Sequence, residues 1–279
     1  MMKVEALLTD EEFKLFRDLI YEESGISLRD ERRSFLEAKL SKRLRAMGMK
    51  SPYRYYKFLT EEEEGKRELL TFLDLLTINE TSFFRNLPQF ELLKTVVLPE
   101  IISRKAKNGR RVLRLWSAGC STGQEPYSIA MVTLEAVPFP ILWDIVILAS
   151  DLSLTALEFA QQGVYPREKV EGVDPSYLSK YFKKLGDLYA IRDEVKRYVV
   201  FDHQNLKHEN GLRDLDVIFC RNVMIYFDRA EQLKLIEKLH RALAKGGYLF
   251  LGHAESLHGL SDKFRFIYRN KGTAYKKIS

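Results

Sequence analysis

The first eighty residues carry apolar side chains at helical spacing. Thr9 is placed to cap a helix and Gly25 to end it. The apolar side of that helix holds Phe13, Phe16, Leu19 and Ile20. A second helix is expected through Leu36, Leu40, Leu44 and Met47, and Ser51-Pro52 starts a third. No stretch alternates as a strand does, so the pattern predicts an all-helical N-terminal domain over residues 1–78.

The pattern changes after Pro88. A helix is predicted over Gln89–Lys105, and another over Arg229–Ala244. Short continuous apolar runs typical of buried strands occur at Val112–Trp116, Ile145–Ala149, Tyr198–Phe201, Val217–Cys220 and Tyr248–Leu251. Strands that alternate with helices indicate an α/β fold with a mostly parallel, doubly wound sheet in residues 79–279. In such sheets the ligand binds beyond the carboxyl ends of the strands.

Two further elements are predicted in this second domain. Phe264–Tyr268 and Thr273–Lys277 are expected to pair as a closing hairpin. A small antiparallel β-subdomain is expected at about 177–201, with Leu188–Ile191 paired to Glu194–Phe201. The sequence therefore predicts two domains and a small β-subdomain within the second.

Composition excludes several classes of protein. Of the 279 residues, 46% are hydrophobic and 30% charged, so the chain is neither disordered nor fibrous. The longest apolar run, Ala136–Ser150, contains Asp144 and two prolines and is too short to span a bilayer. No apolar leader follows Met1, so a cytoplasmic protein without membrane insertion is expected. Cys120 and Cys220 lie far apart and lack nearby ligands, which argues against a metal site and a disulfide framework.

Positive charge is concentrated between Arg29 and Lys57. This window holds ten basic and three acidic side chains, a surplus of seven where the whole chain carries +6. Four of the cations gather on one flank of the predicted helix, namely Arg32, Lys39, Lys42 and Arg43. The flank is either an ordinary solvated face or a docking surface for an acidic partner.

The turn after the first strand and the end of the second carry candidate ligand contacts. Gly119 and Gly123 are four residues apart, which fits neither G-x-G-x-x-G nor a phosphate-binding P-loop. Asp151 ends the second strand, where a carboxylate can bind both ribose hydroxyls, although it could also cap the next helix. Glu125 would repel a diphosphate and attract the α-ammonium of S-adenosylmethionine (SAM), unless it serves only the helix N-terminus. Together these residues favour a nucleoside ligand that carries an amino group.

Two more clusters combine polar, aromatic and cationic residues. Asn79–Arg85 lies at the domain junction, and Cys220–Phe227 follows a predicted strand toward its carboxyl edge. The aromatic and aliphatic members, among them Phe83 and Ile225, are expected to pack rather than to contact a ligand.

Six segments taken together resemble the chemotaxis receptor methyltransferase (CheR) family in order and across nearly the whole chain. These segments are NETSFFRN, SAGCSTGQEPYSIA, LASDLS, QNL, DVIFCRNVMIYFD and GGYLFLGHAES. The resemblance implies a Rossmann-like SAM-dependent methyltransferase that esterifies glutamate side chains on bacterial chemoreceptors and releases S-adenosylhomocysteine, without a metal. Its implied partner is the cytoplasmic helical domain of the receptors, not nucleic acid, and the protein is expected to be a monomer.

The resemblance also implies roles for individual residues. The implied SAM contacts are Asn79, Thr81, Arg85, Glu125, Asp151, Asn205, Leu206, Arg221 and Asn222. Asp151 would hold the ribose, Asn205 and Leu206 the adenine, and Glu125 the methionine end. Arg85 and Tyr226 would lie closest to the methyl group and the incoming glutamate, as the catalytic pair.

A glutamate acceptor needs no general base, because its side chain is already ionised at neutral pH. We therefore expect Arg85 to orient the substrate carboxylate and Tyr226 to limit its approach. The acidic-faced helical receptors of the family favour the docking interpretation of the basic flank.

Two alternatives stay open. A nucleic-acid methyltransferase would also use SAM and a basic surface, but Asn222–Ile225 stands where an amino-group DNA methyltransferase would show Asn-Pro-Pro-Tyr. A SAM-binding regulatory module without turnover is the other alternative, and the presence of Arg85 and Tyr226 speaks against it.

Overall fold

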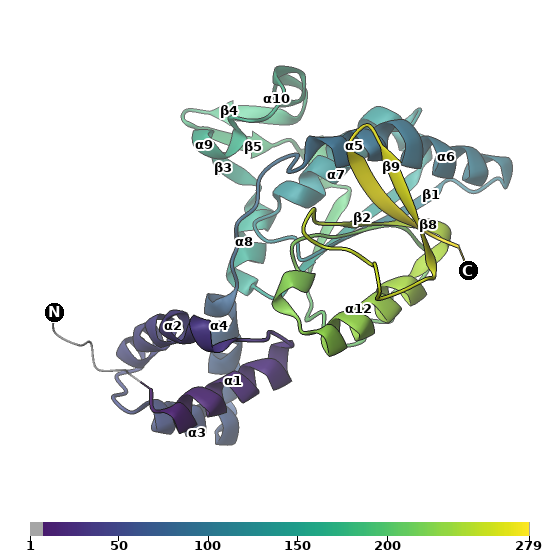
Figure 1. Ribbon diagram of the computed structural model, residues 1–279. Helices are drawn as coiled ribbons and strands as arrows, with labels where there is room; N and C mark the ends of the chain where they lie inside the picture. The colour runs from purple at the N-terminus through teal and green to yellow at the C-terminus, as the bar shows by residue number, and fades with distance from the viewer. Residues whose placement is uncertain (1–7, 279) are drawn as a thin grey trace. The chain divides into compact units, whose positions relative to one another are not determined.

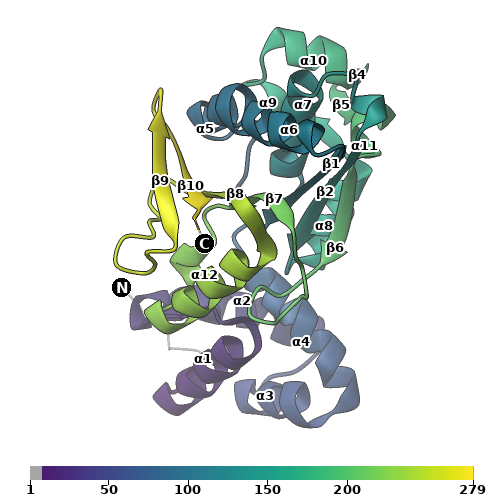
Figure 2. The same ribbon diagram turned by 90° about the vertical axis from the view of Figure 1, so that its right-hand side faces the viewer.

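The computed structural model describes residues 8–278, and the chain divides into two compact units. The N-terminal unit extends through Ile78 and also includes the distant segment Tyr226–Glu231. The second unit consists of Asn79–Ile225 and the chain from Gln232 onward. Figures 1 and 2 show the elements of each unit.

The N-terminal unit is helical, as expected. Its elements are α1 (Asp10–Ser24), the 3-10 helix η1 (Asp30–Arg32), α2 (Arg33–Ala46), α3 (Pro52–Glu61) and α4 (Glu63–Leu76). Thr9 and Glu12 form a reciprocal capping box at the start of α1, and Gly25 ends the helix in the left-handed conformation. Buried aromatic rings of Phe16, Tyr55 and Phe72 pack edge-on or stacked at the centre of the helices.

A seven-stranded sheet forms the core of the second unit, in the order β6-β2-β1-β7-β8-β10-β9. Its strands are β1 (Val112–Ala118), β2 (Asp144–Asp151), β6 (Val199–His203), β7 (Leu215–Cys220), β8 (Leu243–Leu251), β9 (Phe264–Arg269) and β10 (Gly272–Lys277). The first five of these are parallel, and β9 and β10 close the sheet as an antiparallel hairpin. The expected doubly wound sheet and its closing hairpin are confirmed.

Helices cover both faces of this sheet. Figures 1 and 2 show α5, α6 and α7 together on one face and α12 on the other. The remaining helices of the chain are α5 (Leu87–Leu92), the π-helix η2 (Leu93–Val97), α6 (Leu98–Lys107), α7 (Gln124–Ala136), η3 (Pro140–Leu142), α8 (Leu154–Gln162), α9 (Arg167–Val170), α10 (Pro175–Tyr181), α11 (Asp193–Lys196), η4 (Met224–Tyr226) and α12 (Arg229–Ala242). The rings of Phe219 and Phe250 stack in the sheet core with centroids 4.3 Å apart. No described helix is long and apolar enough to cross a membrane.

The small antiparallel sheet differs from its expected extent. It is formed by β3 (Val164–Pro166), β4 (Phe182–Leu185) and β5 (Leu188–Ile191) in the order β3-β5-β4. The expected partner of β5 was wrong, because α11 interrupts that segment and β6 pairs in parallel with β2. Gly186, with a φ of +62°, instead allows the tight turn that joins β4 to β5.

Candidate functional site

The carboxyl ends of β1, β2 and β7 meet at one edge of the large sheet. The chain runs outward from β1 to β2 and β6 on one side, and to β7 and β8 on the other. Because the connections diverge there, the region beyond β1 is the place where a doubly wound sheet binds its ligand. The turns that follow these strands carry the sequence-predicted contacts.

The turn after β1 is tied to the end of β2. The amides of Gly119 and Cys120 both donate to the Ser150 carbonyl, at 2.8 and 2.9 Å. Gly119 has a φ of +85°, and a Cβ on it would lie 2.4 Å from Cγ2 of Val223. Only glycine satisfies both the backbone conformation and the close packing at this point.

Asp151 lies at the end of β2 and fixes the neighbouring backbone. Its Oδ2 accepts from the Ser121 amide at 2.7 Å and its Oδ1 from the Ser153 amide at 2.9 Å. Ser153, not Asp151, caps helix α8 through its side chain. The carboxylate therefore fixes the backbone of both turns.

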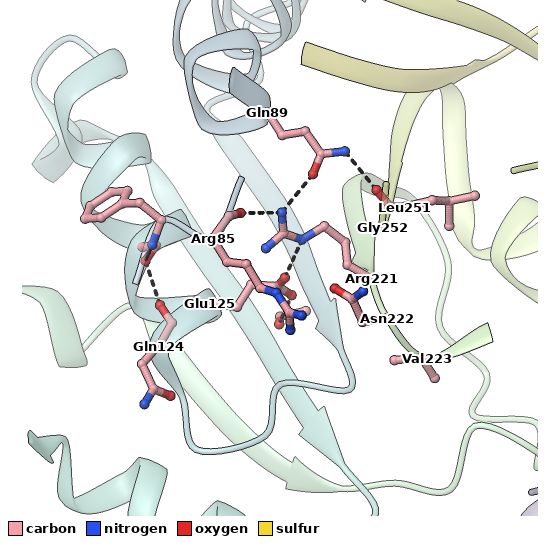
Figure 3. A network of polar contacts seen from close by, with 12 residues as sticks. Arg85, Gln89, Gln124, Glu125, Arg221, Asn222, Val223, Leu251 and Gly252 are labelled. Carbon is pink, nitrogen blue, oxygen red and sulfur yellow. Dashed lines mark hydrogen bonds and ion pairs between the residues drawn. The ribbon is translucent and has the colours of Figure 1, made fainter. Parts of the chain in front are cut away.

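A buried ion pair joins the start of α7 to the end of β7. The Arg221 Nε donates to Oε2 of Glu125 at 2.7 Å, and the Ser117 hydroxyl donates to Oε1 at 2.7 Å. Both charged residues are buried. A cationic ligand group near Glu125 would meet a carboxylate already paired with Arg221, not an isolated anion (Figure 3).

Gln89 extends this network and was missed from the sequence. Its Oε1 accepts from Arg221 Nη1 at 2.8 Å, and its Nε2 donates to the Leu251 carbonyl at 2.8 Å (Figure 3). The side chain is fully buried. A glutamine within an apolar helix gives only a weak sequence signal, because its partners lie more than 130 residues away in the chain.

Arg85 is held through its backbone. The residues on either side, Phe84 and Asn86, both have positive φ values, of 50° and 65°. The Phe84 amide donates to the Ser128 hydroxyl at 3.0 Å, and the Arg85 carbonyl accepts from Arg221 Nη1 at 2.6 Å. A left-handed phenylalanine is unusual and persists only where its surroundings enforce it. The guanidinium donates to the Glu80 carbonyl at 2.9 Å in an exposed hydrogen bond.

Glu255 is a second residue missed from the sequence. Its carboxylate accepts from the amides of Asn222, Val223 and Gly252 at 2.7 to 2.9 Å. Asn222 has a φ of +60°, which asparagine tolerates better than most residues. Glu255 thus fixes the turn after β7, whose Val223 packs against Gly119.

The remaining implied SAM contacts lie along the same edge or near it. Asn79 interacts with the hydroxyls of Ser121 and Ser153, each at 3.4 Å. Asn205 follows β6 and accepts the Lys207 amide at 2.9 Å, while the Leu206 carbonyl accepts from Lys238. Thr81, the last of these residues, is half-buried.

Tyr226 belongs to the N-terminal unit, unlike Arg85. It ends η4, and its carbonyl accepts from the Ser27 amide at 2.8 Å. This long-range contact could not be read from the sequence.

The four cations of the basic flank have different surroundings. Arg43 makes a bidentate pair with Glu68, with both nitrogen–oxygen distances at 2.6 Å, and Tyr55 donates to the same carboxylate at 2.6 Å. The Glu68 carboxylate raises the pKa of Arg43, and burial together with Glu68 raises the pKa of Tyr55. The other three, Arg32, Lys39 and Lys42, are exposed or half-buried. The first two lie over the ring of Phe35.

The two cysteines are buried in the core of the second unit. Burial raises the pKa of both Cys120 and Cys220 well above its usual range, so neither thiol is poised as a nucleophile. Within residues 8–278, no three His, Cys, Asp or Glu side chains gather as a metal site would require.

The fold and this edge define a class of protein. Five parallel strands closed by an antiparallel hairpin, with a glycine turn after β1 and an acid ending β2, are those of a Rossmann-like, SAM-dependent methyltransferase. Residues 79–273 match the model "CheR methyltransferase, SAM binding domain", and residues 11–77 match "CheR methyltransferase, all-alpha domain". The chain belongs to the CheR methyltransferase family.

Curated relatives agree over nearly the whole chain. Chemotaxis protein methyltransferase 2 of Vibrio cholerae is 36% identical over 277 residues, covering 98% of this chain and 95% of the relative. The chemotaxis protein methyltransferase of Borreliella burgdorferi is 34% identical and covers 90% of each chain. That of Escherichia coli is 35% identical, covering 92% of this chain and 88% of the relative.

Proposed function

We propose that this protein transfers the methyl group of SAM to glutamate side chains on the cytoplasmic helical domain of chemoreceptors. The product would be a glutamate methyl ester. Support comes from the family, from relatives named chemotaxis protein methyltransferases, and from the polar edge beyond β1, β2 and β7. We assign methyl transfer to residues 79–279 and receptor docking to residues 1–78.

The residues at this edge fit SAM. The Asp151 carboxylate is held by two amides at the carboxyl end of β2, where an acidic side chain binds ribose hydroxyls in sheets of this kind. Asn205 and Leu206 follow β6, next to β2, where an adenine could bind. We place the methionine end near Glu125, with the ammonium binding beside the Glu125–Arg221 pair.

One observation carries the proposal for the acceptor. Arg85 has a backbone fixed between two left-handed residues and by Arg221, and its guanidinium has one backbone hydrogen bond, to Glu80. A planar guanidinium can bind a carboxylate through two parallel hydrogen bonds. We infer that Arg85 orients the glutamate carboxylate, and that Tyr226 limits its approach.

Bound SAM supplies an electrophilic methyl group on a sulfonium. The acceptor carboxylate has a pKa of about 4.3 in a free side chain and is ionised at neutral pH. The chain therefore has to position the carboxylate and exclude water, and does not need to remove a proton. This agrees with the inert thiols of Cys120 and Cys220.

Receptor docking is assigned to the accessible cations of the basic flank. Lys42 is exposed, and Arg32 and Lys39 carry their charge beside the Phe35 ring. An acidic helical bundle would be attracted to this surface, with a strong dependence on salt.

The deciding experiment is transfer of labelled methyl from SAM to a receptor cytoplasmic fragment. Label released as methanol by mild alkali would support a glutamate ester. Alkali-stable label, or label transferred to nucleic acid instead, would contradict the proposal. SAM binding without label on any receptor fragment would favour the regulatory module.

A further inference from the structure

The opposite end of the large sheet carries an exposed apolar loop. This apolar loop, Pro138–Trp143, connects α7 to the start of β2. Phe139 and Ile141 are 74% and 76% exposed, the highest values among large hydrophobic side chains in residues 8–278, and Leu142 is 54% exposed. Three adjoining exposed side chains of this kind form an apolar patch, and such patches mark interaction sites with proteins or membranes.

The loop is built to hold these side chains outward. Phe139 has a φ of +50° and lies between two prolines, which restrict the backbone on both sides. The Leu142 amide donates to the Phe139 carbonyl at 2.9 Å, and the Trp143 amide donates to Pro140 at 3.0 Å. The exposure therefore belongs to a hydrogen-bonded turn and not to an unstructured segment.

A basic segment, Lys107–Arg111, lies beside the apolar loop. The Asp144 amide, directly after the loop, donates to the Arg111 carbonyl at 2.8 Å, and Asp144 is in register with Val112. The side chains of Lys107, Arg110 and Arg111 are exposed, and within the described chain none has an acidic partner.

The two acids that flank the apolar loop in the chain, Glu135 and Asp144, are each paired with a cation. The Asp144 carboxylate pairs with Arg114, which lowers the pKa of Asp144. Glu135, near the end of α7, pairs with Lys180 at 2.6 Å. The combined surface is therefore apolar at its centre and positively charged at its side.

We propose that the apolar loop and the basic segment bind the surface of an anionic phospholipid bilayer. Side chains from one short loop offer less area than a stable protein interface needs, about 800 Å² per partner. They suit shallow insertion between headgroups, with the cations bound to lipid phosphates. Such attachment does not require a membrane-spanning segment.

The apolar loop and the basic segment lie at the end of the sheet opposite the proposed SAM site, so membrane binding there would leave that site accessible. The loop and the basic segment precede β2 and β1, whereas the proposed SAM site follows these strands. A seven-residue strand spans about 23 Å, so lipid bound at one end leaves the other accessible. The proposal does not depend on which substrate is methylated.

The test is co-sedimentation of the full chain with vesicles. We expect binding to vesicles of 70% phosphatidylcholine and 30% phosphatidylglycerol, no binding to pure phosphatidylcholine, and weaker binding at high salt. Each cation near an anionic surface is worth about fivefold in affinity, so Lys107→Ala with Arg111→Ala should weaken binding about 25-fold. Phe139→Ser with Ile141→Ser should weaken it at least tenfold.

Matched controls come from elsewhere on the second unit. Phe266→Ser removes an aromatic side chain of β9 that is 55% exposed, and Lys169→Ala removes an exposed cation from α9. Both should bind vesicles as the unaltered chain does, and all variants should keep SAM binding.

Three results would overturn the proposal. One is failure of the unaltered chain to sediment with the anionic vesicles. Another is equal binding by the Phe139→Ser, Ile141→Ser variant. The third is a dimer in solution that this variant abolishes, because a second copy of the chain would then be the occupant of the surface.

Discussion

Replacing Glu68 by glutamine tests what Arg43 does in the N-terminal unit. Glu68 is buried, and its carboxylate accepts two hydrogen bonds from Arg43 and one from Tyr55, all at 2.6 Å. Glutamine keeps the shape but removes the charge, so the Arg43 guanidinium loses its counter-ion and meets an amide donor. The N-terminal unit would keep its helices, but the positive charge of Arg43 on α2 would no longer be balanced by a negative charge on α4.

The magnitude follows from burial. Breaking one side of a buried ion pair costs about 3–5 kcal/mol. The Arg43 side chain is 17% exposed and can recover some hydration, so we expect the lower end, about 3 kcal/mol. A unit of this size changes its melting temperature by roughly 4–8 °C per kcal/mol, which predicts a loss of roughly 12–24 °C.

Hydrogen exchange of the full chain is the suitable assay, because it reports each unit separately. Amides of α2, α3 and α4 should exchange about 100-fold faster in Glu68→Gln, while those of β1, β2 and β7 stay protected. Glu63→Gln is the matched control, since its pair with Lys66 is exposed and worth at most about 1 kcal/mol.

Exchange in α2–α4 that changes by less than threefold would refute this reasoning. The Arg43–Glu68 pair would then contribute little to stability, and Arg43 would be available to contact a partner. If the prediction holds, charge reversal at Arg43 damages the fold, and a docking experiment that includes it could not separate lost docking from lost stability.

The remaining predictions concern docking, catalysis and SAM binding. Lys39→Glu with Lys42→Glu should raise the KM for a receptor fragment about tenfold and make that KM less sensitive to salt. An unchanged KM would show that the basic flank is an ordinary solvated face. Arg85→Ala should lower the rate of methyl transfer at least 100-fold. Arg85→Lys should restore only part of that rate, because lysine lacks the planar guanidinium with its paired donors. Near-normal turnover of the alanine variant would show that Arg85 has no role in the mechanism. Gly119→Ala should weaken SAM binding at least tenfold by calorimetry, because the new Cβ would lie 2.4 Å from Val223 at a φ of +85°, and an affinity within twofold of the original would contradict this packing argument.

Local patterns determined the element types. Helical spacing around Phe16 and the capping signal at Thr9 predicted α1, and the apolar runs that become β1 and β2 predicted parallel buried strands. Such signals are strong where an element contacts the same core along its whole length.

The small sheet shows where local patterns fail. Residues 194–201 are rich enough in apolar side chains to suggest a partner for β5, but β2 offers a longer parallel pairing at the edge of the large sheet. Strand pairing is a competition between distant segments, and hydrophobic pattern alone does not rank the competitors.

The candidate site likewise depends partly on local sequence and partly on long-range contacts. The sequence by itself determined the helical and α/β domains, the resemblance to the family, and the residues at strand ends, because each rests on neighbours in the chain. Only the tertiary structure decided that Arg221 neutralises Glu125, that Gln89 and Glu255 hold the surrounding backbone, and that Arg43 is bound to Glu68. Apart from the contact of Glu255 with the nearby Gly252 amide, these contacts join groups at least 25 residues apart. Their charge balance depends on burial that only folding creates.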